Sequence, residues 1–308
     1  MTGTKGKIAF CFPGQLQEKP RLKDSPLRED AFFREYAERA FDQSKFDLLR
    51  CSFEEGEERG RSFEYLELQM ATYLLSMIHY YRLEAEGWVP AVAAEHSMGI
   101  YAALAACGAI TFEEGLFITE FIGRLLQREG ASSPGALAGI IGLPLEQVQE
   151  ICSRLNGYQL VIANYNGSMH HVLSGEPDGV EEAIAFALRK GAISAARLPF
   201  DTALHCPSLL SLKEKISSGL EEIEFQSPRT PVLNHWTIRP LRKEEIKEFL
   251  SEEIGRPVYW VRCVEELIRK GVTEFIEVGH EAGLTKLIRW INRNVEARTA
   301  EDRLGQRS

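Results

Sequence analysis

Apolar and polar positions alternate along the chain in blocks whose lengths predict a mixed α/β fold. Residues 8–12 form a short apolar run that ends at a Pro-Gly pair, which is typical of a buried strand. Residues 64–86 carry apolar side chains near helical spacing, which predicts a long helix. Thr111 and Glu114 form a capping box that would start a second amphipathic helix.

The middle of the chain has its own order of elements. The pattern predicts strands at 136–141, 160–164, 171–174 and 194–198, and helices at 145–155 and 180–189. The order β-α-β-β-α-β is the split βαβ pattern of a ferredoxin-like subdomain. We therefore expect an α/β fold with a large α/β-hydrolase-like subdomain, residues 1–132 and 198–308. An inserted ferredoxin-like (βαββαβ) subdomain would occupy residues 133–197.

The last third of the chain returns to the larger subdomain. Helices are predicted at 207–222, 257–270 and 282–291, and strands at 231–234 and 274–278. The charged tail after Asn292 is expected to fray. The charged runs at 53–61 and 242–253 are expected to be solvated faces.

A serine stands where a predicted strand turns abruptly into a helix. Residues 93–100 read AAEHSMGI, after an apolar approach and before an alanine-rich helix former. Such a turn is the mechanical core of a nucleophile elbow: it exposes Ser97 Oγ, and the new helix points its first N–H groups at whatever the serine attacks. Glu95 replaces the first glycine of the usual G-x-S-x-G pattern, so the spacing alone leaves catalysis open.

The composition limits the kinds of partner that we expect the protein to bind. The 308 residues are 44% hydrophobic, as in an ordinary globular protein, and the net charge of −9 argues against non-specific nucleic-acid binding. No apolar run approaches the roughly 20 residues that cross a bilayer, and no signal peptide is apparent. Six cysteines lie without C-x-x-C pairs, so neither a metal site nor a disulfide scaffold is expected. We expect a cytoplasmic protein with no membrane partner.

Several segments together carry a family resemblance. These are FPGQ at 12–15, EHSMG at 95–99, GALAGIIGL at 135–143, ANYN at 163–166, His205 with its helix, PVYW at 257–260 and EFIEVG at 274–279. In this order they resemble the malonyl-CoA:acyl-carrier-protein transacylases and the acyltransferase domains of polyketide synthases. The resemblance runs from residue 8 to about 292, and the family's architecture includes a subdomain inserted at 136–197.

The resemblance implies roles for residues at matching positions. Ser97 would be the nucleophile that takes the acyl group, and His205 would be its general base and then the acid that protonates the leaving thiol. The backbone carbonyl of Glu253 would orient His205. The backbone amides of Gln15 and Met98 would form the oxyanion hole.

The resemblance also implies the reaction and its partners. The acyl pocket would include Gln69, Ile122, Asn166 and Leu204. A thioester would acylate the serine, and a second nucleophile would remove the acyl group in a ping-pong cycle. The expected partner is an acyl carrier protein with its phosphopantetheine-bound acyl group, with acyl-CoA as an alternative donor. No cofactor and no metal ion are implied.

One departure from the family pattern concerns the substrate. Ile122 stands where malonyl-specific members have an arginine, five residues before Gln127, while Arg124 and Arg128 lie on other sides of the helix. The malonyl carboxylate prefers a bidentate guanidinium, so burying it against isoleucine would be costly. The pocket is therefore expected to take acetyl or longer uncharged acyl groups.

Two further departures lie beside the serine. Leu16 replaces a glycine of the family's Gln-Gly-Ser-Gln loop and would either narrow the mouth of the site or lie on the surface. Glu95 replaces glycine, and its carboxylate would either repel a charged acyl group or point outward harmlessly.

These features favour a hydrolase of acyl-carrier-protein thioesters. It would remove non-malonyl acyl units from carrier proteins in polyketide biosynthesis through an acyl-serine intermediate, as a proofreading acyl hydrolase. The alternative is an acyl-CoA:acyl-carrier-protein S-acyltransferase that uses malonyl-CoA or another acyl-CoA. A third hypothesis is a non-catalytic carrier-protein docking module. Hydrolysis and transfer differ in whether water or a thiol reaches the acyl-enzyme, and no residue decides between them.

Overall fold

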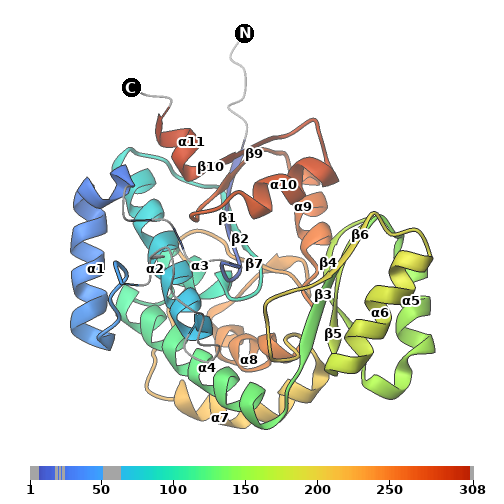
Figure 1. The fold of residues 1–308 in the computed structure, drawn as a ribbon. Helices are drawn as coiled ribbons and strands as arrows, with labels where there is room; N and C mark the ends of the chain where they lie inside the picture. Colours follow the sequence, from blue (N-terminus) through green and yellow to red (C-terminus); the bar gives the residue numbers. More distant parts are fainter. Residues whose placement is uncertain (1–6, 18–19, 21, 23–24, 51–63, 306–308) are drawn as a thin grey trace. The chain divides into compact units, whose positions relative to one another are not determined.

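The computed structural model describes residues 7–17, 20, 22, 25–50 and 64–305, and it confirms the predicted α/β fold (Figure 1). The chain forms two compact units. The first comprises Met1–Gly123, Ile223–Glu244 and Val264–Ser308, and the second comprises Arg124–Glu222 and Glu245–Cys263.

A four-stranded parallel sheet organises the first unit. Its strands are β1 (Lys7–Phe12), β2 (Val92–Glu95), β9 (Val272–Glu277) and β10 (Glu296–Thr299). They lie in the order β10-β9-β1-β2, and every neighbouring pair is parallel. The apolar run of β1 is buried from Ala9 to Phe12, as expected for an inner strand of a parallel sheet. A separate hairpin joins β7 (Leu233–Asn234) to β8 (Arg239–Pro240).

Helices surround this sheet within the first unit. They are η1 (Pro26–Glu29), α1 (Ala31–Ser44), α2 (Glu64–Ala85), α3 (Gly99–Ala106), α10 (Gly283–Ile291) and α11 (Ala300–Leu304), together with parts of α4 (Phe112–Ser132) and α9 (Trp260–Arg269). The predicted capping box is present, because Thr111 Oγ1 accepts from the Glu114 N–H and Glu114 Oε2 accepts from the Thr111 N–H. None of the helices within the described ranges combines the length and apolar character that a membrane crossing needs.

The second unit contains the ferredoxin-like pattern. Its strands are β3 (Ala136–Ile141), β4 (Val161–Gly167), β5 (His170–Gly175) and β6 (Ser194–Arg197). They form an antiparallel sheet in the order β4-β5-β3-β6, and α5 (Leu145–Arg154) and α6 (Pro177–Arg189) pack together against it (Figure 1). Val148 and Ile151 of α5 meet Val180 and Ala183 of α6 in its core.

The compact second unit extends further than these four strands. It also contains η2 (Asn156–Tyr158), η3 (Pro207–Leu212), α7 (Lys213–Gly219), η4 (Glu253–Gly255) and most of α8 (Lys243–Glu252). The predicted subdomain limits, residues 133–197, enclose the four strands, and as limits they stay a prediction.

The predictions of a frayed tail and of a single helix at 207–222 are wrong. The charged run at 242–253 is solvated on one face only, where Lys243, Glu244 and Glu248 are exposed, and the run at 53–61 lies outside the described residues. The tail after Asn292 forms β10 and α11, because Ala297 and Ala300 are buried and Thr299 caps the helix by accepting from the Asp302 N–H. The charged run at 242–253 contains α8, whose apolar side chains at Ile246, Phe249 and Leu250 are buried. The single helix predicted at 207–222 is divided into η3 and α7.

The first turn of α3 presses against the end of β1. A Cβ built on Gly99 would lie 2.2 Å from the carbonyl oxygen of Phe12 and 2.8 Å from that of Pro13. Backbone atoms cannot move aside as a side chain can, so this position requires glycine. All eight residues of α3 are buried, which leaves the helix no room to shift.

We predict that Gly99→Ala destabilises the protein by about 2 kcal/mol, because overpacking in a closed interior strains the surrounding backbone. Urea unfolding curves measure the change as a shift in midpoint at constant slope. The matched control is Gly157→Ala, where an added Cβ meets nothing within 4 Å and stability should change by no more than about 0.5 kcal/mol. Equal midpoints for the two variants would contradict the prediction.

Candidate active site

Ser97 lies in the turn between β2 and α3. Its φ is 57°, in the left-handed region that residues other than glycine rarely adopt. The His96 N–H donates to Phe12 O at 3.0 Å, and the Gly99 N–H donates to His96 O at 3.1 Å, so the turn is tied to the end of β1. A strained strand–turn–helix around a serine is the geometry of a nucleophile elbow.

The loop after β1 passes beside this elbow. A Cβ built on Gly14 would lie 3.6 Å from Ser97 Cβ. Leu16 is only 4% exposed, and its N–H donates to Thr72 Oγ1 of α2 at 3.0 Å. The expectation that Leu16 might lie on the surface is therefore wrong: it anchors the loop that carries Gln15. The Gln15 Nε2 atom is buried and has no hydrogen-bond partner among the described residues.

Glu95 does not point outward, so that alternative is wrong as well. The residue is 1% exposed, and its Oε1 lies 2.5 Å from Nδ1 of His235. Both side chains are completely buried. Sequence analysis missed His235 because it lies 140 residues further along the chain, in a turn with no recognisable motif.

His205 lies in the second unit, just before η3. Its φ is 58°, and its backbone N–H donates to Ile254 O at 2.7 Å. The ring is 4% exposed, and its Nδ1 lies 2.9 Å from Arg256 O and 3.2 Å from Glu253 O. Carbonyl oxygens only accept, so Nδ1 carries the proton and Nε2 of the neutral ring keeps the basic lone pair. Sequence analysis named the Glu253 carbonyl and missed the nearer one, Arg256.

The predicted pocket residues divide between the two units. Gln69 of α2 meets α4 where Gly123 leaves space: a Cβ on this glycine would lie 2.3 Å from Gln69 Oε1. Ile122 precedes that glycine and is buried. In the second unit Asn166 is buried on β4, and Leu204 packs against a small apolar cluster of that unit.

The structure therefore gathers the predicted site residues in two groups. The first unit carries Gln15, Gln69, Ser97, Met98 and Ile122, and the second carries Asn166, Leu204, His205 and Glu253. Met98 stands at the N-cap of α3, the position from which a backbone amide of an elbow would act. One residue in each group, Ser97 in the first and His205 in the second, has a left-handed backbone.

Cysteines are weaker candidates for the nucleophile. The five cysteines in the described part of the chain are free thiols. Burial raises the pKa of Cys107 to about 12 and that of Cys152 to about 11, and it raises the pKa of Cys11 well above the usual value. These three thiols stay protonated at neutral pH and lack the reactive thiolate. No group of three metal-ligating side chains is gathered within the described residues.

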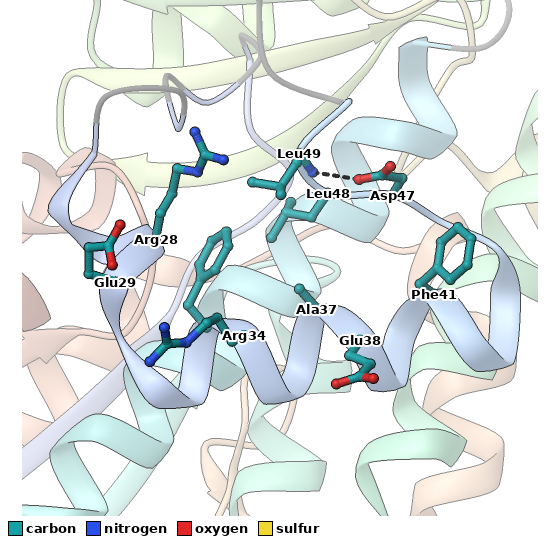
Figure 2. A pocket seen from close by; sticks show the side chains of 10 residues that line it. Arg28, Glu29, Arg34, Ala37, Glu38, Phe41, Asp47, Leu48 and Leu49 are labelled. Carbon is teal, nitrogen blue, oxygen red and sulfur yellow. Dashed lines mark hydrogen bonds between the residues drawn. The ribbon is translucent and has the colours of Figure 1, made fainter.

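A separate hollow of about 500 Å³ lies beside α1 in the first unit (Figure 2). Phe41, Ala37 and Leu48 line it, with charged side chains of both signs around them, and the Leu49 N–H donates to Asp47 Oδ1 at 3.0 Å. It contains none of the predicted site residues. We therefore exclude it from the candidate active site.

Known proteins resemble the chain over nearly its whole length. Residues 35–301 match the family described as the acyl transferase domain. The malonyl CoA-acyl carrier protein transacylase of Bacillus subtilis (strain 168) is 28% identical over 307 residues, covering 96% of this chain and 94% of that protein. The solved structure of the malonyl CoA-acyl carrier protein transacylase from Coxiella burnetii superposes with a TM-score of 0.89 at 27% identity, covering 98% and 96% of the two chains.

A longer relative belongs to polyketide biosynthesis. The polyketide biosynthesis protein ThaF of Burkholderia thailandensis is 30% identical over 284 residues, which are 92% of this chain and 24% of ThaF. This chain thus spans about a quarter of ThaF. Fold and comparisons together define an acyltransferase-type enzyme. The chain belongs to the acyl transferase domain family.

We predict that the neutral imidazole of His205 is protonated on Nδ1, because that atom faces two carbonyl oxygens. Long-range hydrogen–nitrogen correlation NMR reports the tautomer directly, and the His205→Gln variant assigns the signals. Glu253→Gln should leave the tautomer unchanged, because the acceptor is the backbone carbonyl. A ring protonated on Nε2 would contradict the prediction.

Proposed function

We propose that the protein transfers acyl groups between thioesters through an acyl-Ser97 intermediate, with an acyl carrier protein as one substrate. The left-handed elbow at Ser97, tied to the end of β1, is the observation that carries the proposal. Among solved structures, a type II polyketide synthase acyl-carrier protein in complex with its malonyl-transacylase superposes with a TM-score of 0.86 at 27% identity. The proposal includes a cytoplasmic location, which free thiols at the five described cysteines support.

In the proposed first half-reaction Ser97 Oγ attacks the thioester carbonyl carbon while His205 Nε2 accepts the hydroxyl proton. The C–S bond then breaks, and the proton on His205 passes to the leaving thiolate. The backbone N–H groups of Gln15 and Met98 would stabilise the negative charge that develops on the carbonyl oxygen. In the second half-reaction a new thiol gives its proton to His205 and attacks the carbonyl carbon of the acyl-serine. A C–S bond forms, the ester C–O bond breaks, and His205 returns the proton to Ser97 Oγ.

The backbone carbonyls of Glu253 and Arg256 are placed to orient His205 for its proposed role as general base. They hold the ring by its Nδ1–H and would also stabilise the imidazolium that forms during each half-reaction. No carboxylate is required for this orientation. His205 and Ser97 belong to different compact units, so the proposal requires the imidazole to reach the serine in the active conformation.

A second candidate function is hydrolysis of uncharged acyl units from carrier proteins, with water in place of the second thiol. The observation that favours it is Ile122, a side chain only 1% exposed at the position where malonyl-specific members of the resembled family have an arginine. A carboxylate buried against isoleucine would lose its hydration without gaining a partner. An acetyl or longer neutral chain would instead gain apolar burial there.

We predict that acetyl- or butyryl-loaded carrier protein acylates Ser97, because the elbow exposes the hydroxyl to a thioester. Intact-mass spectrometry should show the adduct on the native protein and none on Ser97→Ala. His205→Ala should slow acylation by at least about a hundredfold, since loss of a general base removes its catalysis. Adding a fresh holo carrier protein to the acyl-enzyme then separates the two candidate functions.

The fate of the acyl group decides between them. Transfer moves the label to the new carrier protein faster than it appears as free acid, and hydrolysis gives the reverse order. Native protein that forms no adduct on Ser97, while Ser97→Ala keeps its biological function, would instead support a non-catalytic docking module.

We predict that Ile122→Arg raises malonyl acylation of Ser97 relative to acetyl acylation, because a guanidinium can bind the second carboxylate in bidentate fashion. The rise should be about tenfold or more, as expected for gaining a charge-assisted hydrogen bond. Competition between malonyl- and acetyl-pantetheine, followed by intact mass, measures the ratio. The control is Ile122→Met, which is uncharged and close to isoleucine in volume and should not raise the ratio. Native protein that already prefers malonyl would contradict the argument from Ile122.

A further inference from the structure

The carboxylate of Glu95 is buried two residues before the candidate nucleophile. Glu95 is the last residue of β2, and its Oε1 lies 2.5 Å from Nδ1 of His235. Both side chains are fully buried. Breaking this hydrogen bond would leave a buried polar group unpaired. The pair therefore fixes the end of β2 against the segment that carries His235.

That segment is itself held in one shape. His235 lies in the turn between β7 and β8, where Asn234 Oδ1 accepts the N–H groups of Trp236 at 2.8 Å and Thr237 at 3.1 Å. Ile238 closes the turn with a φ of 56°, which is strained for a β-branched residue. Such a conformation persists where surrounding contacts over-determine it. The turn thus presents His235 in a fixed place.

The segment that leads into this turn is attached to β2 through the backbone. The Ala93 N–H, two residues before Glu95, donates to Pro231 O at 2.8 Å, just before β7. On the other side of β2, the His96 N–H donates to Phe12 O of β1. The elbow therefore begins between two anchors, the end of β1 on one side and the β7–β8 turn on the other.

We propose that Glu95 and His235 form a positioning pair that holds the nucleophile elbow in its reactive conformation. The inference rests on the proposed role of Ser97 as nucleophile. The left-handed backbone of Ser97 is unfavourable by itself, so contacts nearby must hold it. A shift of the reacting atom by about 1 Å can slow a reaction by roughly a hundredfold. The pair acts through the backbone of Ser97 and does not touch the acyl group.

The first unit offers a matched control at the opposite side of β1. Glu277 ends β9 and is buried like Glu95. Its carboxylate accepts the N–H groups of Leu284 at 2.9 Å and Thr285 at 2.7 Å at the start of α10. Glu277 therefore caps a helix, and its carboxylate contacts α10 on the side of β1 away from Glu95. Removing it should lower stability without changing the rate at which Ser97 is acylated.

The test compares single-turnover acylation of Ser97 by acetyl-pantetheine in Glu95→Met, His235→Phe, the double variant, Glu95→Gln and Glu277→Met. Each single apolar variant should lower the maximal rate about tenfold or more, with the half-saturating concentration nearly unchanged. The double variant should be no slower than the slower single, because the two residues act as one unit. Glu95→Gln keeps an oxygen acceptor for Nδ1–H and should restore the rate to within about threefold of native.

The final amplitude reports the fraction of folded protein, so a merely structural loss lowers the amplitude and leaves the rate constant unchanged. If Glu95→Met does not fold, the double variant, which leaves neither polar partner buried without the other, carries the same test. Native-like rates in the apolar variants, a Gln variant as slow as Met, or equal slowing by Glu277→Met would each overturn the proposal. Native protein without any Ser97 adduct would overturn the proposed function instead.

Discussion

The first turn of α3 meets the end of β1 so closely that one added carbon at Gly99 has no room. This contact fixes where the helix begins, and the chain must reverse between Glu95 and Gly99 to reach it. Ser97 takes the left-handed backbone that such a short reversal demands. The apolar core around β1 and α3 supplies the packing that holds the strain. The left-handed backbone of the candidate nucleophile thus follows from how closely the buried strand β1 and the buried helix α3 pack together.

In the second unit a left-handed backbone position carries the candidate general base. His205 also has a left-handed backbone, and the carbonyls of Glu253 and Arg256 hold its ring from the Nδ1 side. Neither acceptor is a side chain, so the orientation of the imidazole depends on the path of the backbone around η4. Ile238, in the turn that carries His235, has the same kind of backbone conformation. Among the described residues, five non-glycine positions have a positive φ: Ser97, His205 and Ile238 belong to the proposed site or to the turn that carries His235, while Lys45 and Gln159 end helices.

Local signals predicted most of the fold, and long-range contacts account for what they missed. The six elements of the split βαβ pattern and the capping box at Thr111 depend on neighbouring residues, so the sequence alone indicates them. The strand β10 has one buried residue, Ala297, and owes its existence to pairing with β9, which no periodicity reveals. The elbow was recognisable because its residues are consecutive. The partner of Glu95 was not, because His235 comes near it only in the folded chain.

The pairing of Glu95 changes the argument about substrate. An unpaired carboxylate beside the serine would repel a malonyl group, but this one is buried against an imidazole, which reduces the field it can exert on the acyl chain. In the proposed pocket, the choice between charged and neutral acyl groups would then depend on Ile122, a buried side chain that offers no guanidinium. The choice between water and a thiol depends on a separate property, namely what can approach acyl-Ser97. Under the proposed function, a change at Ile122 would therefore alter which acyl group is accepted without altering whether water or a thiol removes it.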